Sequence, residues 1–252
     1  MNDVVAVRDR IRFRGPTVRT SVVCRSRLDG RYAAANGRVL RVLAPAGDGK
    51  STQVWRWVDE DDRRTHWLDL EPIDNDPLVL ARAIATGLVE RSSLDPDDAA
   101  DDATPFDDVA KLVAAPVEPF VLVLDDVHHL VSDESAALID LIIGHLSRDS
   151  VLVLVGRSQP RAESIARHRL DPGVVDVTAD DLAFDLSETE ELLTALGVDA
   201  DVDMLTALDE QFEGWPAGLR LAGQVLATRQ GDVRLPLEKL GDLSHISDYI
   251  TQ

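Results

Sequence analysis

The chain has 252 residues, of which 44% are hydrophobic, and it carries a formal net charge of −20. The hydrophobic residues occur in short runs along the chain, which excludes a disordered tail and predicts a packed core. The negative charge argues against direct binding of nucleic acid, because proteins that bind DNA gain affinity by neutralising phosphates.

The beginning of the chain predicts a protein that stays in the cytoplasm. It contains arginine and aspartate at close intervals and has no apolar block of the size that a signal peptide requires. No stretch reaches the length needed to span a membrane, so we expect no membrane partner. Cys24 is the only cysteine, so no internal disulfide can form, and we expect it to be a small core residue rather than a nucleophile.

Short apolar runs alternate with helical patterns over the first 184 residues. Strands are predicted at residues 37–43, 65–70, 119–124, 150–155 and 174–177. Helices are predicted at about residues 50–58, 77–90, 106–114 and 134–146. The alternation predicts a five-stranded parallel sheet in an α/β domain. The runs at 120–124 and 151–155 lack in/out alternation, as expected for strands covered by helices on both faces.

From about residue 185 the pattern is helical only. Ser187 and Glu190 have the spacing of a capping box, Gly197 is expected to end the helix, and amphipathic segments follow at 201–212 and 217–229. We therefore predict an α/β domain over residues 1–184 and a small helical lid domain over 185–252. The acidic segment 94–105 is predicted to be a surface loop, with a metal site there as the alternative.

The segment that begins at Ala44, APAGDGKS, has the spacing of a phosphate-binding loop, with alanine in place of the usual first glycine. Gly47 and Gly49 would let backbone N–H groups turn inward around phosphate oxygens at the positive end of the next helix. Lys50 is one of three lysines in the chain and is predicted to reach the β- and γ-phosphates. The alternative is an ordinary glycine turn.

Two adjacent carboxylates, Asp125 and Asp126, follow the buried run at 120–124, at the sheet edge where ligands of open parallel sheets bind. Asp125 is predicted to hold Mg²⁺ together with Ser51, and Asp126 to polarise the attacking water as a general base. The alternative is a helix-capping turn. Because a further strand, at 65–70, lies between the two signatures, the layout favours the ATPase (ASCE) type over simple P-loop kinases.

Arg157 follows the strand at 150–155 and is the predicted sensor of the γ-phosphate, since a guanidinium can bind it in a bidentate manner. The alternative is a surface arginine. His128 and His129 are predicted to be structural.

These segments resemble the STAND signalling ATPases, in particular the nucleotide-binding domain of MalT-like, large LuxR-type transcription regulators. The resemblance covers nearly the whole chain and rests on VVCRSRL from Val22, APAGDGK from Ala44, WLDLEPIDND from Trp67, LDDVH from Leu124, RS at Arg157 and EGWPAGL from Glu213. The sequence departs from the family pattern at Cys24, Val127 and Gly156.

The resemblance implies ATP or ADP with Mg²⁺ as ligands, with the adenine enclosed by an early Val/Arg segment and a Gly-Trp-Pro turn. It also implies that the chain is part of a longer regulator, which self-associates through further domains, because residues 244–250 resemble the start of a helix leading into a winged-helix domain. The predicted catalytic residues are Lys50, Asp126 and Arg157. The predicted nucleotide-binding residues are Val23, Arg25, Ala46, Gly47, Asp48, Gly49, Lys50, Ser51, Thr52 and Pro216.

We predict a switch in which ATP binding and slow hydrolysis control self-assembly. The alternative is a metabolic P-loop hydrolase or kinase with a second substrate and fast turnover. A third possibility is a scaffold that no longer needs its nucleotide.

Overall fold

The computed structural model describes residues 15–16, 22–35, 39–89, 104–116, 118–158 and 174–228. Several sequence predictions lie outside these residues, including most of the acidic loop at 94–105 and the segment at 244–250. None of the helices in the described parts of the chain combines the length and the apolar character that crossing a membrane requires.

Five parallel strands form one sheet in the order β2-β3-β4-β1-β5. The strands are β1 (Val39–Leu43), β2 (Arg64–Asp69), β3 (Phe120–Asp125), β4 (Val151–Gly156) and β5 (Val174–Val177). The predicted ATPase type is confirmed, but the strand inserted between β1 and β3 is β4, whereas β2, on which the prediction rested, lies at the edge of the sheet. The strands begin and end within two residues of their predicted limits where those limits are described.

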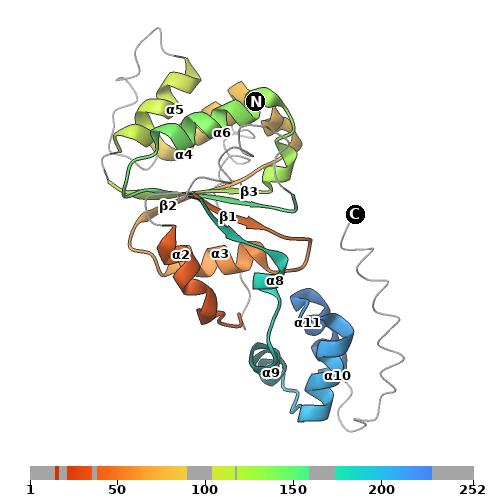
Figure 1. The fold of residues 1–252 in the computed structure, drawn as a ribbon. Helices are drawn as coiled ribbons and strands as arrows, with labels where there is room; N and C mark the ends of the chain where they lie inside the picture. The colour runs from red at the N-terminus through yellow and green to blue at the C-terminus, as the bar shows by residue number, and fades with distance from the viewer. Residues whose placement is uncertain are drawn as a thin grey trace.

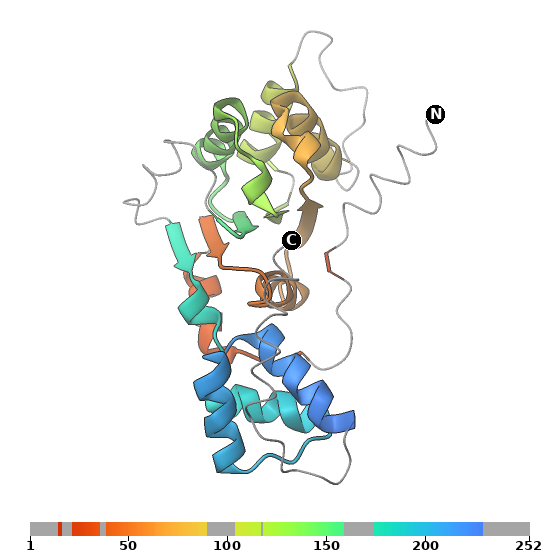
Figure 2. The ribbon, with the colours of Figure 1, turned by 90° about the vertical axis from the view of Figure 1, so that its right-hand side faces the viewer.

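Helices cover both faces of the sheet (Figure 1). One face carries α4 (Pro77–Val89), α5 (Pro105–Ala114) and α6 (Asp133–His145). The other carries α2 (Asp29–Ala34) and α3 (Lys50–Asp59). Short 3-10 turns occur at η1 (Ser26–Leu28), η2 (Pro72–Asn75) and η4 (Val127–His129). Figure 2 shows α9 (Leu186–Ala195), α10 (Val202–Phe212) and α11 (Pro216–Thr228) gathered beyond one end of this layered part.

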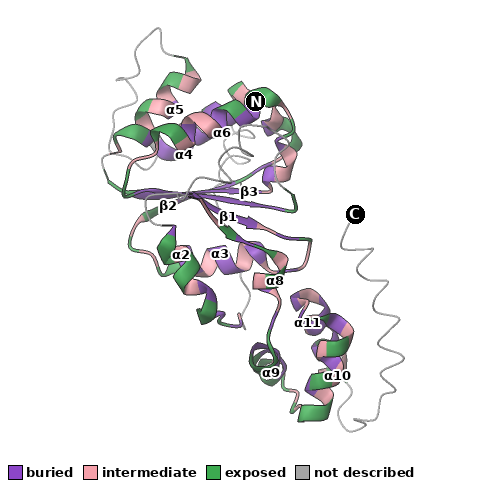
Figure 3. Cartoon of the chain, in the orientation of Figure 1, coloured by how far each residue is buried: buried purple, intermediate pink, exposed green. Residues whose placement is uncertain are grey.

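The central strands are buried along their whole length, which explains their unbroken Val/Leu composition. Every residue of β3 and of β4 is buried (Figure 3). Leu80, Ile84 and Ile139 pack on one side of the sheet, and Val54 and Trp57 pack on the other. A strand covered on both faces gains from apolar residues at every position, so the absence of alternation is the expected pattern.

The helical unit consists of α9 (Leu186–Ala195), α10 (Val202–Phe212) and α11 (Pro216–Thr228), and it is preceded by α8 (Ala179–Leu182), whose Leu182 belongs to the core on the sheet. It has a core of its own, which includes Leu193, Leu208 and Leu219. Val23, from the segment before η1, joins this core and so ties the two parts of the chain together. The domain boundary at residue 185 stays a prediction.

The predicted capping box at Ser187 and Glu190 is wrong. The box is formed by Asp185, whose carboxylate accepts a hydrogen bond from the Glu188 amide at 2.8 Å, and by Glu188, which accepts one from the Asp185 amide at 3.2 Å. Both pairs have the correct spacing, but the earlier one lets the buried Glu188 carboxylate also bind Arg27, at 3.0 Å. Gly197 does follow the helix, with φ +79°, in a Schellman-type turn.

Cys24 is exposed, so the expectation of a core residue is also wrong. The segment from 22 to 25 precedes η1 and is not helical, and exposure alternates along it from Val23 to Arg25. Val23 and Arg25 are buried on either side of Cys24, which leaves the thiol on the outer side.

Candidate functional site

The loop between β1 and α3 has the conformation that its glycines allow. Gly47 and Gly49 adopt φ of +87° and +76°, in the left-handed region that favours glycine. Ala44 is not among the residues with positive φ, and its amide donates to the Gly156 carbonyl at 3.2 Å. Alanine in place of the first glycine therefore costs no backbone strain, because Ala44 continues the strand.

Lys50 is the first residue of α3 and is only 8% exposed. Its ammonium donates to the Pro45 carbonyl at 2.6 Å. Burial lowers the pKa of Lys50, against the opposing charges of Asp48, Asp125 and Asp126. A buried ammonium group beside a glycine loop favours the binding of an anionic ligand in that loop.

Asp125 is 6% exposed at the C-terminal end of β3. Burial raises its pKa to about 6, in spite of hydrogen bonds from the Ser51 side chain and from the Asp126 amide, the latter at 2.9 Å. The structure thus brings together Ser51 and Asp125, the two residues predicted to hold the metal. A hydroxyl and a carboxylate are oxygen ligands of the kind that Mg²⁺ prefers.

Asp125→Asn is expected to raise the free energy of unfolding of the metal-free domain at pH 8. It should also abolish the stabilisation that Mg²⁺ gives to the domain. The rise in the pKa of Asp125 from 3.8 to about 6 corresponds to roughly 3 kcal/mol. Because the folded state holds this proton more tightly than the unfolded state, the wild type loses that stability as pH rises through 6, and the variant does not. Thermal unfolding between pH 4 and pH 8, with and without Mg-ADP, measures both effects. Equal pH profiles for the two proteins would contradict the prediction.

Asp126 follows directly and adopts a left-handed conformation, with φ 59°. Its carboxylate is half exposed and lies 3.5 Å from Nδ1 of His128. A non-glycine residue in this region is held there by its surroundings, and such residues are frequent at functional sites. The second carboxylate is therefore much more accessible to solvent than that of Asp125.

Arg157 lies just beyond the end of β4 and is exposed. Its positive charge contributes to lowering the pKa of Lys50 and of His128, so it lies within electrostatic reach of both.

Two departures from the family pattern also meet at this edge. A Cβ on Gly156 would lie 2.9 Å from the side chain of Val127. Glycine at position 156 therefore leaves room for the valine at position 127.

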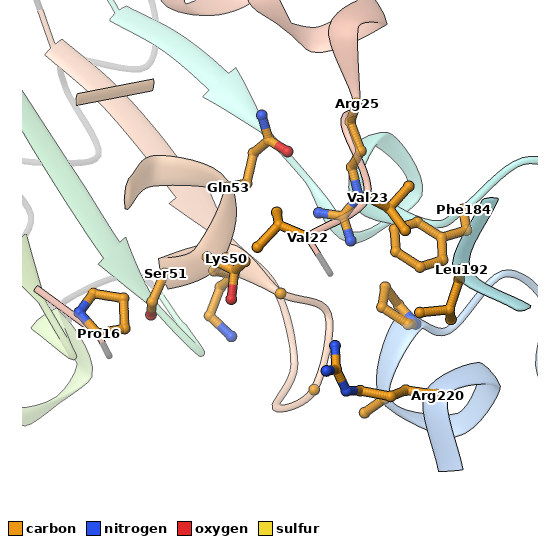
Figure 4. A pocket seen from close by; sticks show the side chains of 15 residues that line it. Pro16, Val22, Val23, Arg25, Lys50, Ser51, Gln53, Phe184, Leu192 and Arg220 are labelled. Atoms are coloured by element: carbon orange, nitrogen blue, oxygen red, sulfur yellow. The ribbon is translucent and has the colours of Figure 1, made fainter. Parts of the chain in front are cut away.

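A cavity of about 500 Å³ lies between the loop, the segment before η1 and the helical unit (Figure 4). Eight of the predicted nucleotide-binding residues line it, namely Val23, Arg25, Gly47, Gly49, Lys50, Ser51, Thr52 and Pro216. Ala46 and Asp48 belong to the same loop without lining the cavity. The catalytic candidates Asp126 and Arg157 also lie outside the lining, at the neighbouring sheet edge.

Arg25 connects the cavity to its surroundings. Its guanidinium lies 4.5 Å from the centre of the Phe184 ring and donates from Nη2 to the Asp48 carbonyl at 3.2 Å. Burial lowers the pKa of Arg25 to about 10, so the side chain stays cationic at neutral pH. Its buried Nε has no hydrogen-bond partner among the described residues.

Seven lining residues were missed from the sequence: Pro16, Val22, Gln53, Phe184, Leu192, Ala217 and Arg220. Arg220 is the most informative of them, because its guanidinium forms no hydrogen bond or ion pair with the part of the chain that the structure describes. It lies one helical turn after Pro216, on the same face of α11, and that spacing could have identified it. Figure 4 shows its side chain directed toward the phosphate-binding loop.

The charge of the lining is opposite to that of the chain. Arg25, Lys50 and Arg220 line the cavity, and none of its lining residues is a carboxylate. In a chain with a net charge of −20, this concentration of cations selects for an anion.

The strand order, the glycine loop with its buried lysine and the acidic end of β3 define a P-loop ATPase fold. No protein-family model matches the chain. It is 26% identical to the HTH-type transcriptional regulator MalT of Yersinia enterocolitica over 234 residues. That alignment covers 86% of this chain and 25% of the relative. An alignment with MalT of Serratia proteamaculans gives 26% identity and covers 91% of this chain and 27% of the relative. The chain thus spans about a quarter of the length of these curated relatives.

Many solved structures share the fold. A STAND protein with a tetratricopeptide repeat sensor from Pyrococcus horikoshii matches with a TM-score of 0.60 and 13% identity, over 90% of this chain and 33% of that one. A Walker-type ATPase of Pyrococcus abyssi matches with a TM-score of 0.59 and 15% identity, over 94% of this chain and 79% of that one. The resemblance predicted from the sequence is confirmed: the chain is similar to part of MalT and has the P-loop ATPase fold.

Proposed function

We propose that this chain is the nucleotide-dependent switch domain of a longer, cytoplasmic transcription regulator. It binds ATP or ADP with Mg²⁺, hydrolyses ATP slowly, and passes the state of the nucleotide to the rest of the protein. The observation that carries the proposal is the convergence of the phosphate-binding loop, the early Val/Arg segment and the Gly-Trp-Pro turn on one cationic cavity.

The proposal assigns each end of the cavity to one part of the nucleotide. Lys50 and the backbone N–H groups around Gly47 and Gly49 bind the β- and γ-phosphates, and Thr52 binds the α-phosphate. The base lies by Val23, Arg25 and Pro216, where apolar walls and a guanidinium are available.

The chemistry is assigned to the neighbouring sheet edge. Ser51 and Asp125 would hold Mg²⁺, which neutralises charge that develops on the phosphate oxygens. Asp126 accepts a proton from the attacking water, and Arg157 detects the γ-phosphate. Loss of that phosphate then changes the contacts that favour one domain orientation over another.

The experiment that tests the proposal begins with denaturing the purified chain and identifying any released nucleotide by chromatography. Calorimetric titration with Mg-ADP and Mg-ATP then measures affinity, and phosphate release measures turnover. We expect binding of both nucleotides and turnover well below one per second. Turnover near ten per second, as in ordinary enzymes, would favour a metabolic hydrolase or kinase. Absence of binding would refute the proposal.

Arg220 is expected to contribute to the affinity for the nucleotide from the helical unit. Arg220→Gln should weaken binding of Mg-ATP about tenfold, because a charge-assisted hydrogen bond to a phosphate is lost. The midpoint of thermal unfolding without nucleotide should not change, since the guanidinium has no partner among the described residues. The matched control is Arg82→Gln, an exposed arginine on α4. Equal affinities for the two variants, measured by calorimetry, would remove Arg220 from the site.

A further inference from the structure

We infer that Trp215 holds the phosphate-binding loop in its binding shape from outside, so that the nucleotide is released quickly only when α11 separates from the loop. The inference rests on the proposed function and adds a positioning residue to it. The contact that carries it is a hydrogen bond from the indole Nε1 of Trp215 to the carbonyl of Ala46, at 3.3 Å. Trp215 does not line the cavity, so it acts on a ligand indirectly, and its indole hydrogen bond goes to the loop.

A second hydrogen bond reinforces the first. The amide of Ala217 donates to the carbonyl of Gly47 at 3.1 Å. Ala217 is the second residue of α11, and the N–H groups of the first helical turn have no acceptor within their own helix. The loop carbonyl therefore satisfies a donor that would otherwise need water, and the helix in turn fixes the orientation of the loop peptide.

The geometry of Gly47 shows how closely the two parts approach. A Cβ at this position would lie 2.7 Å from the indole nitrogen of Trp215 and 2.8 Å from Cβ of Ala217. Gly47 is thus required on its outer side by the contact with the helical unit, in addition to its positive φ. The loop segment whose N–H groups would face a phosphate is therefore the same segment whose carbonyls, those of Ala46 and Gly47, accept hydrogen bonds from the helical unit.

Trp215 is firmly attached to the helical unit, so the loop and the unit cannot move independently while the contact lasts. Its amide donates to the Phe212 carbonyl at 2.8 Å, and the Phe184 amide donates to the Gly214 carbonyl at 2.8 Å. The indole ring also packs over Gly218, where an added Cβ would overlap the ring. Movement of α11 away from the sheet would therefore remove both donors from the loop together.

Coupling of this kind is reciprocal. If docking of α11 raises the affinity for the nucleotide, then bound nucleotide must stabilise the docking of α11 by the same free energy. Two independent measurements follow, one on the nucleotide and one on the helix.

The first measurement compares Trp215→Phe with the wild type in the full 252-residue chain. Phenylalanine keeps an aromatic ring over Gly218 and loses the indole N–H. The probe is ADP labelled with an N-methylanthraniloyl fluorophore, bound with Mg²⁺ and displaced by excess unlabelled ADP. We expect release to be roughly three- to tenfold faster, as loss of one hydrogen bond predicts. The control is Trp57→Phe, which loses an indole hydrogen bond to Asp29, at 3.0 Å, outside the cavity lining.

The second measurement needs no variant and covers the case in which Trp215→Phe does not fold. Saturating Mg-ADP should slow hydrogen exchange in a peptide spanning residues 215–219 of the wild type. Unchanged exchange, or equal release rates for the wild type and a folded Trp215→Phe, overturns the inference and leaves the proposed function standing. A wild-type chain that binds no labelled ADP overturns both.

Discussion

Replacing Lys50 with alanine is expected to remove most of the affinity for Mg-ATP and Mg-ADP. Lys50 is buried, and its charge lies beside the glycine loop, so its loss leaves the phosphates of a bound nucleotide without a desolvated cation. Truncating one partner of such a pair costs about 2–5 kcal/mol, which corresponds to a loss of affinity of roughly 30-fold to several thousand-fold. Calorimetric titration measures the change directly.

The same substitution should not destabilise the chain in the absence of nucleotide. Burial already lowers the pKa of Lys50, which means that the folded state opposes its charge. Removing the ammonium relieves that cost and loses one hydrogen bond, to the Pro45 carbonyl. The matched control is Lys111→Ala, at an exposed position on α5. Equal affinities for the two variants would show that the loop does not hold phosphates, and the proposed function would fail with it.

The parts of the fold that could be predicted are those with a local signal. Unbroken Val/Leu runs identify β3 and β4 because the strands are buried on both faces. The loop at Gly47 and Gly49 could be predicted because its backbone conformation needs glycine at fixed spacing. The pairing of Ser51 with Asp125 followed from the rule that parallel strands end at one edge of the sheet.

The parts that could not be predicted depend on how distant segments pack. Trp215 lies 169 positions from Ala46 in the sequence, and no local pattern marks the hydrogen bond between them. Phe184 enters the cavity lining because Arg25 packs over its ring. The capping box at Asp185 was missed because two pairs had the same spacing, and only the contact of Glu188 with Arg27 distinguishes them.

The arrangement gives the helical unit two different connections to the cavity. Arg220 and Pro216 line it, whereas Trp215 and Ala46 form a contact behind the loop. A ligand that fills the cavity would therefore contact α11 directly. It would also stabilise the loop whose carbonyls accept hydrogen bonds from Trp215 and from α11. Both connections lie at the start of one helix, Trp215 directly before α11 and the others in its first two turns, so a rotation of α11 would alter them together.

Replacing Asp126 with asparagine is expected to lower the rate of ATP hydrolysis by about 10²–10⁴-fold, the usual contribution of a general base. Asparagine cannot accept the proton from water, but it tolerates the left-handed conformation that Asp126 adopts, so the turn after β3 should keep its shape. Affinity for Mg-ATP should stay within about twofold of the wild type, because Asp126 does not line the cavity. Single-turnover phosphate release measures the first effect, and calorimetry the second.

The matched control for this substitution is Asp149→Asn, an exposed carboxylate that precedes β4 at the opposite edge of the sheet. It changes the net charge by the same amount, so any general electrostatic effect on the nucleotide appears in both variants. The contrast between them isolates the position of the carboxylate. Hydrolysis that persists in Asp126→Asn at the rate of Asp149→Asn would mean that another group accepts the proton. Loss of binding together with hydrolysis would instead place Asp126 among the residues that hold the metal.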